Sequence, residues 1–414
     1  MPGLLRVTTA GSVNDGKSTL IGRLLQDAKA IFDDQFAAVS AASRRRGRDE
    51  ADLALHVDGL REEREQGITI DVAYRYFGTP RRAFVLADTP GHVEYTRNMV
   101  TGASTADVAI ILADARHGLV EQCRRHAAIA GLLRVRHVVL AVNKMDLVDF
   151  AEEAFDRIAG DFDQLARRLG IPSWTAVPIS ALHGDNVVAR SGRTPWYSGQ
   201  SLLAHLETLE IPAVDDAGTR FVVQLPVRAD ADGNYQGYAG RVASGTLHAG
   251  DTVTVSPGGW TTRVTAIDTF DGALEEAPTG RSVVVRLADD REIERGGLLS
   301  TGAVPAVSGS LVATACWLTD EPLRPGERYR IRHATGEVAA LVDAVESRLD
   351  VSTLDSMPTD ELGLNDIGTV RLRAAERLVL DRYTESRVTG GFLFVEDSSG
   401  APVGAGLVEH PTRA

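Results

Sequence analysis

The chain has 414 residues, of which 43% are hydrophobic and 24% are charged, and its formal net charge at pH 7 is -13. This composition excludes a disordered, collagen-like or disulfide-framework protein, and no stretch reaches the ~20 apolar residues that a membrane span requires. The negative charge also argues against loose electrostatic binding to nucleic acid. We therefore expect a soluble protein of two or three domains.

The compartment is predicted from the N-terminus and the cysteines. Residues 4–10 already form a strand-like run, and no basic region, apolar core or cleavage site of a secretory signal is visible. Cys123 and Cys316 lie far apart without metal or redox spacing. We expect a cytoplasmic protein in which both cysteines are buried free thiols.

Apolar runs and helical patterns alternate in the first half of the chain. The runs that read as buried strands are 5–10, 84–87, 108–113, 137–142 and 174–179. Such alternation predicts an α/β domain in which a mainly parallel sheet carries helices on both faces.

The pattern changes after Pro212 to short alternating runs separated by glycines. Examples are 220–227, 252–256, 263–267 and 282–287. This spacing is typical of β-barrels, and a second break near 304–310 divides the region in two. We therefore predict a nucleotide-binding domain at 1–212 and β-barrel domains at 213–306 and 307–414.

A phosphate-binding loop follows the first predicted strand. Residues 11–18 match GxxxxGK[ST] and precede a helical pattern at 19–27. The backbone N–H groups and the helix N-terminus would surround the phosphates, Lys17 would add a positive charge, and the Ser18 hydroxyl would bind Mg²⁺. The predicted contacts to the nucleotide here are Gly11, Ser12, Val13, Asn14, Asp15, Gly16, Lys17, Ser18 and Thr19.

Two further segments are predicted to sense the terminal phosphate. Asp88 ends an apolar strand and is positioned to hold Mg²⁺ through its water shell, and Gly91 would donate its N–H to the γ-phosphate. Thr69 is the second hydroxyl expected to bind the metal ion. Loss of the γ-phosphate would release these segments and so convert hydrolysis into a conformational change.

The predicted base site selects guanine. Asp146, in the Asn143-Lys144-Met145-Asp146 motif, can accept hydrogen bonds from N1–H and the exocyclic amine, a donor pair that adenine lacks. We expect ATP to be rejected by roughly 10⁴-fold, because the carboxylate would be left unpaired. Asn143 would brace the loop and reach the base, and the Lys144 stem would lie on the purine. Ser180, Ala181 and Leu182 would provide an N–H to O6.

His92 is the predicted catalytic residue, because it directly follows Gly91 and would orient the attacking water. Val13 and Ile68 would form an apolar gate that a partner opens. Asn14 would either bind a monovalent cation or brace the loop.

These motifs resemble those of the translational GTPases, to which elongation factor Tu belongs. The resemblance rests on Gly91-His92-x-x-Tyr95, the 67–70 block and the two trailing β-domains. Longer strings are similar to the family of subunit 1 of bacterial sulfate adenylyltransferase. They lie at 52–55, 57–60, 63–77, 95–99, 196–199, 237–240 and 388–392.

This resemblance implies a GTPase whose hydrolysis of GTP drives ATP and sulfate to adenylyl sulfate and diphosphate. It implies GTP and Mg²⁺ as cofactors and a catalytic small subunit as partner, in a heterodimer or a larger assembly. Asn14 stands where the family usually has an acidic residue, which weakens the case for a monovalent-cation site, and we expect no fused kinase domain after residue 408.

Two alternatives remain open from the sequence alone. A G-domain followed by two barrels would also suit a translation factor that binds tRNA or the ribosome. A sulfation paralogue of a specialised biosynthetic pathway would carry out the same chemistry as the assimilatory enzyme.

Overall fold

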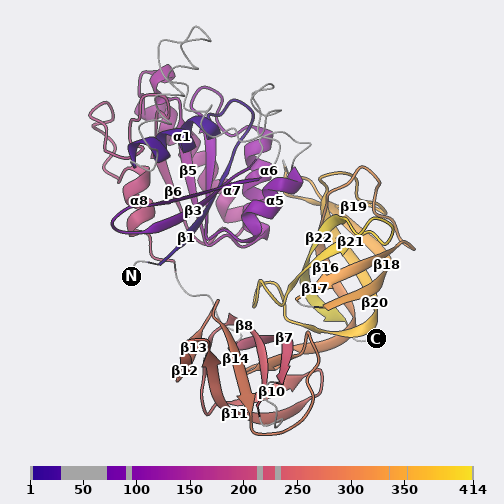
Figure 1. The fold of residues 1–414 in the computed structure, drawn as a ribbon. Helices are drawn as coiled ribbons and strands as arrows, with labels where there is room; N and C mark the ends of the chain where they lie inside the picture. The colour runs from indigo at the N-terminus through magenta and orange to yellow at the C-terminus, as the bar shows by residue number, and fades with distance from the viewer. Residues whose placement is uncertain are drawn as a thin grey trace. The chain divides into compact units, whose positions relative to one another are not determined.

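A computed structural model describes residues 3–28, 72–89, 96–211, 218–228, 235–334, 336–351 and 353–412 (Figure 1). The chain divides into two compact units, one of residues 1–212 with 351–354 and the other of 213–350 with 355–414. Among the described residues, no helix combines the length and the apolar character needed to cross a membrane.

The first unit is an α/β domain built on one six-stranded sheet, in the order β2-β3-β1-β4-β5-β6. Its elements are β1 (Leu5–Ala10), α1 (Lys17–Asp27), β2 (Ala73–Gly78), β3 (Ala83–Asp88), α5 (Thr96–Ser104), β4 (Val108–Asp114), α6 (Glu121–Leu132), β5 (His137–Asn143), the 3₁₀ helix η2 (Met145–Val148), α7 (Glu152–Arg168), β6 (Trp174–Pro178) and α8 (Leu202–Thr208). All neighbouring strands pair in parallel except β2 and β3. The predicted mainly parallel sheet is confirmed.

Helices cover both faces of this sheet, as predicted. Helices α1 and α8 pack on one face through leucines such as Leu20, Leu24 and Leu202, which join the strand side chains in one core cluster. Helices α5, α6 and α7 connect the parallel strands β3, β4, β5 and β6, and the right-handed rule for such connections puts them on the other face. Because both faces are covered, every residue of β4 and β5 is buried.

Helix α7 illustrates how the sequence specifies these helices. Its buried residues Phe155, Ile158, Phe162 and Leu165 recur every three or four positions and form one apolar stripe. Acidic residues occupy its first turn and arginines its last, which complements the helix dipole. The sequence of α7 therefore favours the helix both through packing and through its ends.

The second unit contains two antiparallel barrels. The first comprises β7 (Arg220–Arg228), β8 (Gln236–Ser244), β9 (Thr246–His248), β10 (Thr252–Ser256), β11 (Trp260–Thr269), β12 (Gly272–Leu274), β13 (Glu276–Pro278), β14 (Ser282–Leu287) and β15 (Leu298–Ser300). Its six-strand ring, β10-β15-β7-β8-β14-β11, is closed by the pairing of β10 with β11. Closure leaves the ring without free strand edges, and inward-facing valines and aromatics such as Phe221 and Tyr238 fill its core.

The second barrel comprises β16 (Ala306–Trp317), β17 (Arg328–His333), β18 (Gly336–Leu349), β19 (Ser356–Pro358), β20 (Ile367–Leu380), β21 (Gly391–Val395) and β22 (Pro402–Thr412). Its ring, β17-β21-β22-β16-β20-β18, is closed by β17 and β18. Both predicted barrels are thus confirmed. The domain boundary at 306/307 stays a prediction, and β16 begins at Ala306.

The two cysteines differ from each other. Cys123 on α6 is buried, as predicted, whereas Cys316 is only half-buried, so the predicted burial of Cys316 was wrong; neither cysteine forms a disulfide, as predicted. The reason is strand alternation: the neighbours Ala315 and Trp317 on β16 point into the barrel core, so Cys316 points outward. Cys316 is therefore not part of the barrel core.

Candidate nucleotide site

The motif residues that the structure describes meet at one edge of the sheet. Since β1, β3, β4, β5 and β6 run parallel, their carboxyl ends share this edge. The phosphate loop leaves β1 there, and Asp88, Asn143 and Ser180 lie at or just beyond the ends of β3, β5 and β6. Ligands of open α/β sheets bind at this edge, so the topology alone assembles the predicted site.

The phosphate loop joins β1 to α1 through a backbone that requires glycine. Gly16 has a φ of 93°, and a Cβ added there would lie 2.5 Å from the Asn143 amide nitrogen. Helix α1 begins at Lys17, two residues earlier than expected, so Lys17, Ser18 and Thr19 form its first turn. The free N–H groups of that turn point out of the helix start, where an anion is stabilised.

Lys17 folds back over the loop. Its ammonium donates to the carbonyl oxygens of Gly11 at 2.9 Å and Ser12 at 2.8 Å, and its side chain is buried. Burial lowers the pKa of Lys17, and the carboxylates of Asp88 and Asp15 oppose that shift. A phosphate would meet an ammonium that is already desolvated and placed at the mouth of the loop.

Asp15 supports the loop from inside. Its carboxylate accepts a hydrogen bond from the Ser12 N–H at 2.6 Å, and the Cys123 thiol lies 3.6 Å away. Burial raises the pKa of Asp15, while the Ser12 bond and Lys17 oppose this rise. Val13 and Asn14 are exposed at the tip, and Asn14 adopts a left-handed φ of 66°. The tip therefore faces outward, while the acid that shapes the loop is buried.

Asn143 ties the phosphate loop to the base-binding loops. Its side-chain nitrogen donates to the Asp15 carbonyl at 2.7 Å, and its side-chain oxygen accepts from the Ala181 N–H at 2.9 Å. One buried amide therefore fixes three separate segments relative to each other. The Asn143 amide thus braces the phosphate loop in this structure, and its contact with the base stays a prediction.

The base side of the site contains Lys144, Asp146 and the 180–182 loop. Lys144 has a left-handed φ of 62° and pairs with Asp114 at 2.9 Å. The Asp146 carboxylate lies 3.9 Å from the His183 ring, and Leu182 is half exposed. Arg23 on α1 donates to the carbonyl oxygens of Ala181 and Leu182, which holds this loop beside the helix.

The oxygen donors expected to bind a metal ion are partly described. Asp88 is 1% exposed and accepts from the Thr9 hydroxyl at 3.3 Å, and Ser18 is half-buried in the first turn of α1. Carboxylate and hydroxyl oxygens are hard ligands of the kind that Mg²⁺ prefers. Thr69, Ile68, Gly91 and His92 lie outside the described residues. Their predicted roles stay predictions.

Sequence reasoning missed three residues that contribute to the site: Arg23, Asp114 and Arg116. Asp114 ends β4 at the same edge as the motifs, and Arg116 donates to its carboxylate at 2.7 and 3.0 Å. A charged residue at the carboxyl end of a buried parallel strand is the signal that would have indicated Asp114.

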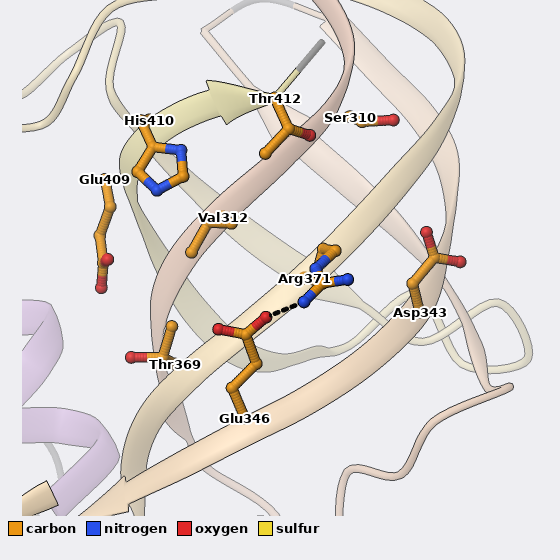
Figure 2. Close-up of a pocket in the computed structure, with 9 residues that line it drawn as sticks. All are labelled: Ser310, Val312, Asp343, Glu346, Thr369, Arg371, Glu409, His410 and Thr412. Atoms are coloured by element: carbon orange, nitrogen blue, oxygen red, sulfur yellow. Dashed lines mark hydrogen bonds and ion pairs between the residues drawn. The ribbon is translucent and has the colours of Figure 1, made fainter. Parts of the chain in front are cut away.

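A second concave surface lies on the outside of the second barrel (Figure 2). It is a cavity of about 570 Å³ lined by Ser310, Val312, Asp343, Glu346, Thr369, Arg371, Glu409, His410 and Thr412. Its three carboxylates occupy the unpaired positions of β-bulges, between 342 and 344, 345 and 347, and 408 and 410. Bulges re-aim side chains, so all three reach the same face.

Two of the three carboxylates of this groove pair with arginines, and the third accepts a hydrogen bond from a hydroxyl. Glu346 pairs with Arg371, Asp343 pairs with Arg373 at 2.8 Å, and Glu409 accepts from Thr314 at 2.7 Å. Within the described ranges, no three acidic, histidine or cysteine residues are placed to hold a metal ion together. The groove therefore lacks the features of the nucleotide edge.

The fold and the site define a P-loop GTPase of the translation-factor class. The family model of the elongation factor Tu GTP binding domain matches residues 3–225, and the GTP-eEF1A C-terminal domain-like model matches residues 310–409. The chain belongs to the elongation factor Tu family of GTP-binding proteins, and it is a GTPase.

Similar proteins extend this assignment. The chain is 52% identical over 420 residues to "Bifunctional enzyme CysN/CysC" of Mycobacterium tuberculosis, covering 100% of this chain and 68% of that protein. It is 48% identical to "Bifunctional enzyme NodQ" of Rhizobium sp., over 99% of this chain and 65% of that protein. It is 47% identical to "Bifunctional enzyme NodQ" of Rhizobium meliloti, over 99% of this chain and 64% of that protein. The resemblance to subunit 1 of bacterial sulfate adenylyltransferase is confirmed by these relatives.

Solved structures match more distantly. The alignment with the structure of sup35 complexed with GDP covers 100% of this chain and 95% of the sup35 chain. The two chains are 22% identical, and the TM-score is 0.44. A likeness at this level adds nothing to the assignment.

Proposed function

We propose that this chain is the GTPase subunit of a two-subunit sulfate adenylyltransferase. In this proposal it binds a catalytic small subunit, and GTP hydrolysis drives ATP and sulfate to adenylyl sulfate and diphosphate in sulfate assimilation. The observation that carries the proposal is that bifunctional CysN/CysC and NodQ enzymes match this chain over 99–100% of its residues, combined with a phosphate loop that Asn143 ties to the base loop.

The coupling has a thermodynamic reason. Sulfate is a weak nucleophile and the phosphosulfate anhydride lies uphill, so the reaction needs a second source of free energy. A GTPase can supply it only if the GTP and GDP states of this chain differ in their interaction with the partner. The switch segments around Thr69 and Gly91 are the proposed source of that difference, because their contacts depend on the γ-phosphate.

The described residues fit the binding steps of this proposal. Gly11 to Thr19 would surround the phosphates, with the Lys17 ammonium exchanging the carbonyl oxygens of Gly11 and Ser12 for phosphate oxygens. Asp146 would accept from the guanine N1–H and amine, and the Ala181 region would donate to O6. Ser18 and Asp88, with Thr69, would hold Mg²⁺, which neutralises charge on the β- and γ-phosphates when bound.

The hydrolytic step is assigned to His92 on the basis of its sequence position after Gly91. The imidazole would orient a water molecule whose oxygen attacks the γ-phosphorus while the bond to the β–γ bridging oxygen breaks. GDP and inorganic phosphate are the products. Positioning and charge stabilisation account for most of such catalysis, and a neutral imidazole is sufficient for it.

Reconstitution with the small subunit tests this function. Adenylyl sulfate should form faster with GTP than with a non-hydrolysable GTP analogue, and His92→Ala should bind GTP yet lose this acceleration. His248→Ala serves as the control, because His248 is an exposed histidine of the first barrel. Equal rates with GTP and the analogue would reject hydrolytic coupling.

The alternative of a translation factor is less supported, because proteins named as bifunctional enzymes CysN/CysC and NodQ match the whole chain at 52% and 48% identity. Co-purification of the chain with tRNA would revive it. A role in a specialised sulfation pathway would involve the same formation of adenylyl sulfate. It would differ from a role in sulfate assimilation in the molecule that finally accepts the sulfate group.

A further inference from the structure

Asp114 at the nucleotide edge accepts several hydrogen bonds. Its oxygens accept from the Lys144 ammonium at 2.9 Å, from Arg116 Nη2 at 2.7 Å and Nε at 3.0 Å, and from the Arg116 backbone N–H at 3.0 Å. Its side chain is 4% exposed, whereas that of Arg116 is 43% exposed. A buried acid thus connects one residue of the base motif to an exposed arginine.

The backbone around Asp114 is fixed independently of its side chain. Asp114 pairs in register with Asn143 across β4 and β5, and the Ala115 N–H donates to the Asn143 carbonyl at 2.9 Å. The carboxylate is therefore held beside the start of the base motif. Lys144 adopts the left-handed region there, a conformation that costs a non-glycine residue free energy and needs compensation from its surroundings.

We propose that Asp114 is a positioning residue for guanine binding, which holds the Lys144 ammonium so that the lysine stem is fixed where the purine packs. The inference rests on the GTP-binding function proposed above. Without the carboxylate, the flexible four-carbon stem would sample many rotamers, and ordering it on binding would cost entropy. Asp114 acts through Lys144 and does not itself contact the nucleotide.

The charge state of Asp114 is consistent with this role. Burial raises its pKa, but the hydrogen bonds from Arg116 and Lys144 outweigh burial and hold the pKa well below its usual range. The carboxylate therefore stays ionised throughout the neutral range. Arg116 covers it from the solvent side, so that Lys144 is not the sole counter-charge of a buried acid.

A double-mutant cycle tests the proposal, with Asp114→Asn, Lys144→Met and the double variant measured by calorimetry for GTP and GDP. Asp114→Asn should raise both dissociation constants by a similar factor, on the order of tenfold, because the change is on the base side. In the Lys144→Met background it should have little further effect. Asp107→Asn is the matched control, since Asp107 precedes β4 at the opposite end of the same strand.

The outcomes separate the two levels of the argument. A wild-type protein that binds no guanine nucleotide would overturn the proposed function itself. Wild-type binding with an equal loss from Asp114→Asn in both backgrounds would overturn only the role of Asp114 through Lys144. If Asp114→Asn does not fold, Asp114→Glu replaces it in the cycle: coupling to Lys144→Met supports the proposal, and strict additivity overturns it.

Discussion

A buried ion pair within the second unit gives the sharpest stability prediction. Arg220 on β7 donates from Nε and Nη2 to Asp381, which follows β20, at 3.0 and 3.1 Å, and both side chains are at most 2% exposed. Arg220 also donates to the carbonyl oxygens of Thr219 and Thr301, and Asp381 accepts from Thr389 at 2.5 Å. The pair therefore joins the two barrels through a nearly saturated network.

Arg220→Met keeps the apolar stem but leaves Asp381 as a buried charge without its arginine. Such a change should cost about 3–5 kcal/mol, because desolvation of the remaining carboxylate is no longer compensated. Arg324→Met is the matched control: Arg324 pairs with Glu361 at 2.8 Å, but both are about half exposed. That pair should contribute only about 0–1 kcal/mol.

The assay is urea unfolding followed by tryptophan fluorescence in a Trp174→Phe/Trp196→Phe background, so that only Trp260 and Trp317 of the barrels report. With a slope of about 2–3 kcal/mol per molar urea, the midpoint of the barrel transition of Arg220→Met should fall by roughly 1–2.5 M. Adding Asp381→Leu should recover part of the loss, since no unpaired charge remains. Equal midpoints for Arg220→Met and Arg324→Met would refute the reasoning.

Three further predictions concern single sites. Asp146→Asn should weaken GTP binding by about 100-fold or more and favour xanthosine triphosphate, whose 2-oxo group accepts from an amide; an unchanged preference for guanine in competition binding would contradict this. Gly160→Ala should stabilise the protein by about 0.5–1 kcal/mol, because alanine favours a helix interior over glycine and the added Cβ meets no atom within 4 Å. Thermal unfolding measures the change, and a lower melting temperature would count against it. Burial lowers the pKa of His126 to about 3. Between pH 6.5 and 3 the unfolded chain therefore binds more protons at this residue than the folded chain does, so the free energy of unfolding should fall as the pH drops through that window. His126→Gln should flatten this slope by at most about 1.4 kcal/mol per pH unit, and a slope equal to wild type would exclude His126 as its source.

Much of the site was predictable because its determinants are local. A phosphate loop must follow a strand and precede a helix, and the parallel order of strands then brings Asp88, Asn143 and Ser180 to one edge. The position of Asn143 at the end of a strand follows from the sequence pattern, whereas its hydrogen bonds to Asp15 and Ala181 form only once the sheet has folded. Some helices and strands extend beyond the patterns that predicted them. Helix α1, for example, begins at Lys17 and not at residue 19, because polar residues at the end of a helix can still take part in its backbone hydrogen bonds.

The missed features depend on long-range pairing. Asp114 acquires its role only when β4 lies beside β5, and Arg23 only when α1 packs beside the 180–182 loop. The antiparallel edge strand β2 carries exposed Tyr74 and Tyr76 and gives no buried-strand pattern. The carboxylates of the barrel groove reach one face through β-bulges, which no periodicity of two reveals.

Calorimetric titration of the purified chain with GTP, GDP and ATP in the presence of Mg²⁺ tests the central claim most directly. The account predicts saturable binding of both guanine nucleotides and roughly 10⁴-fold weaker binding of ATP, because Asp146 finds no donor pair on adenine. Binding of ATP as tightly as GTP, or no heat with either guanine nucleotide, would contradict it.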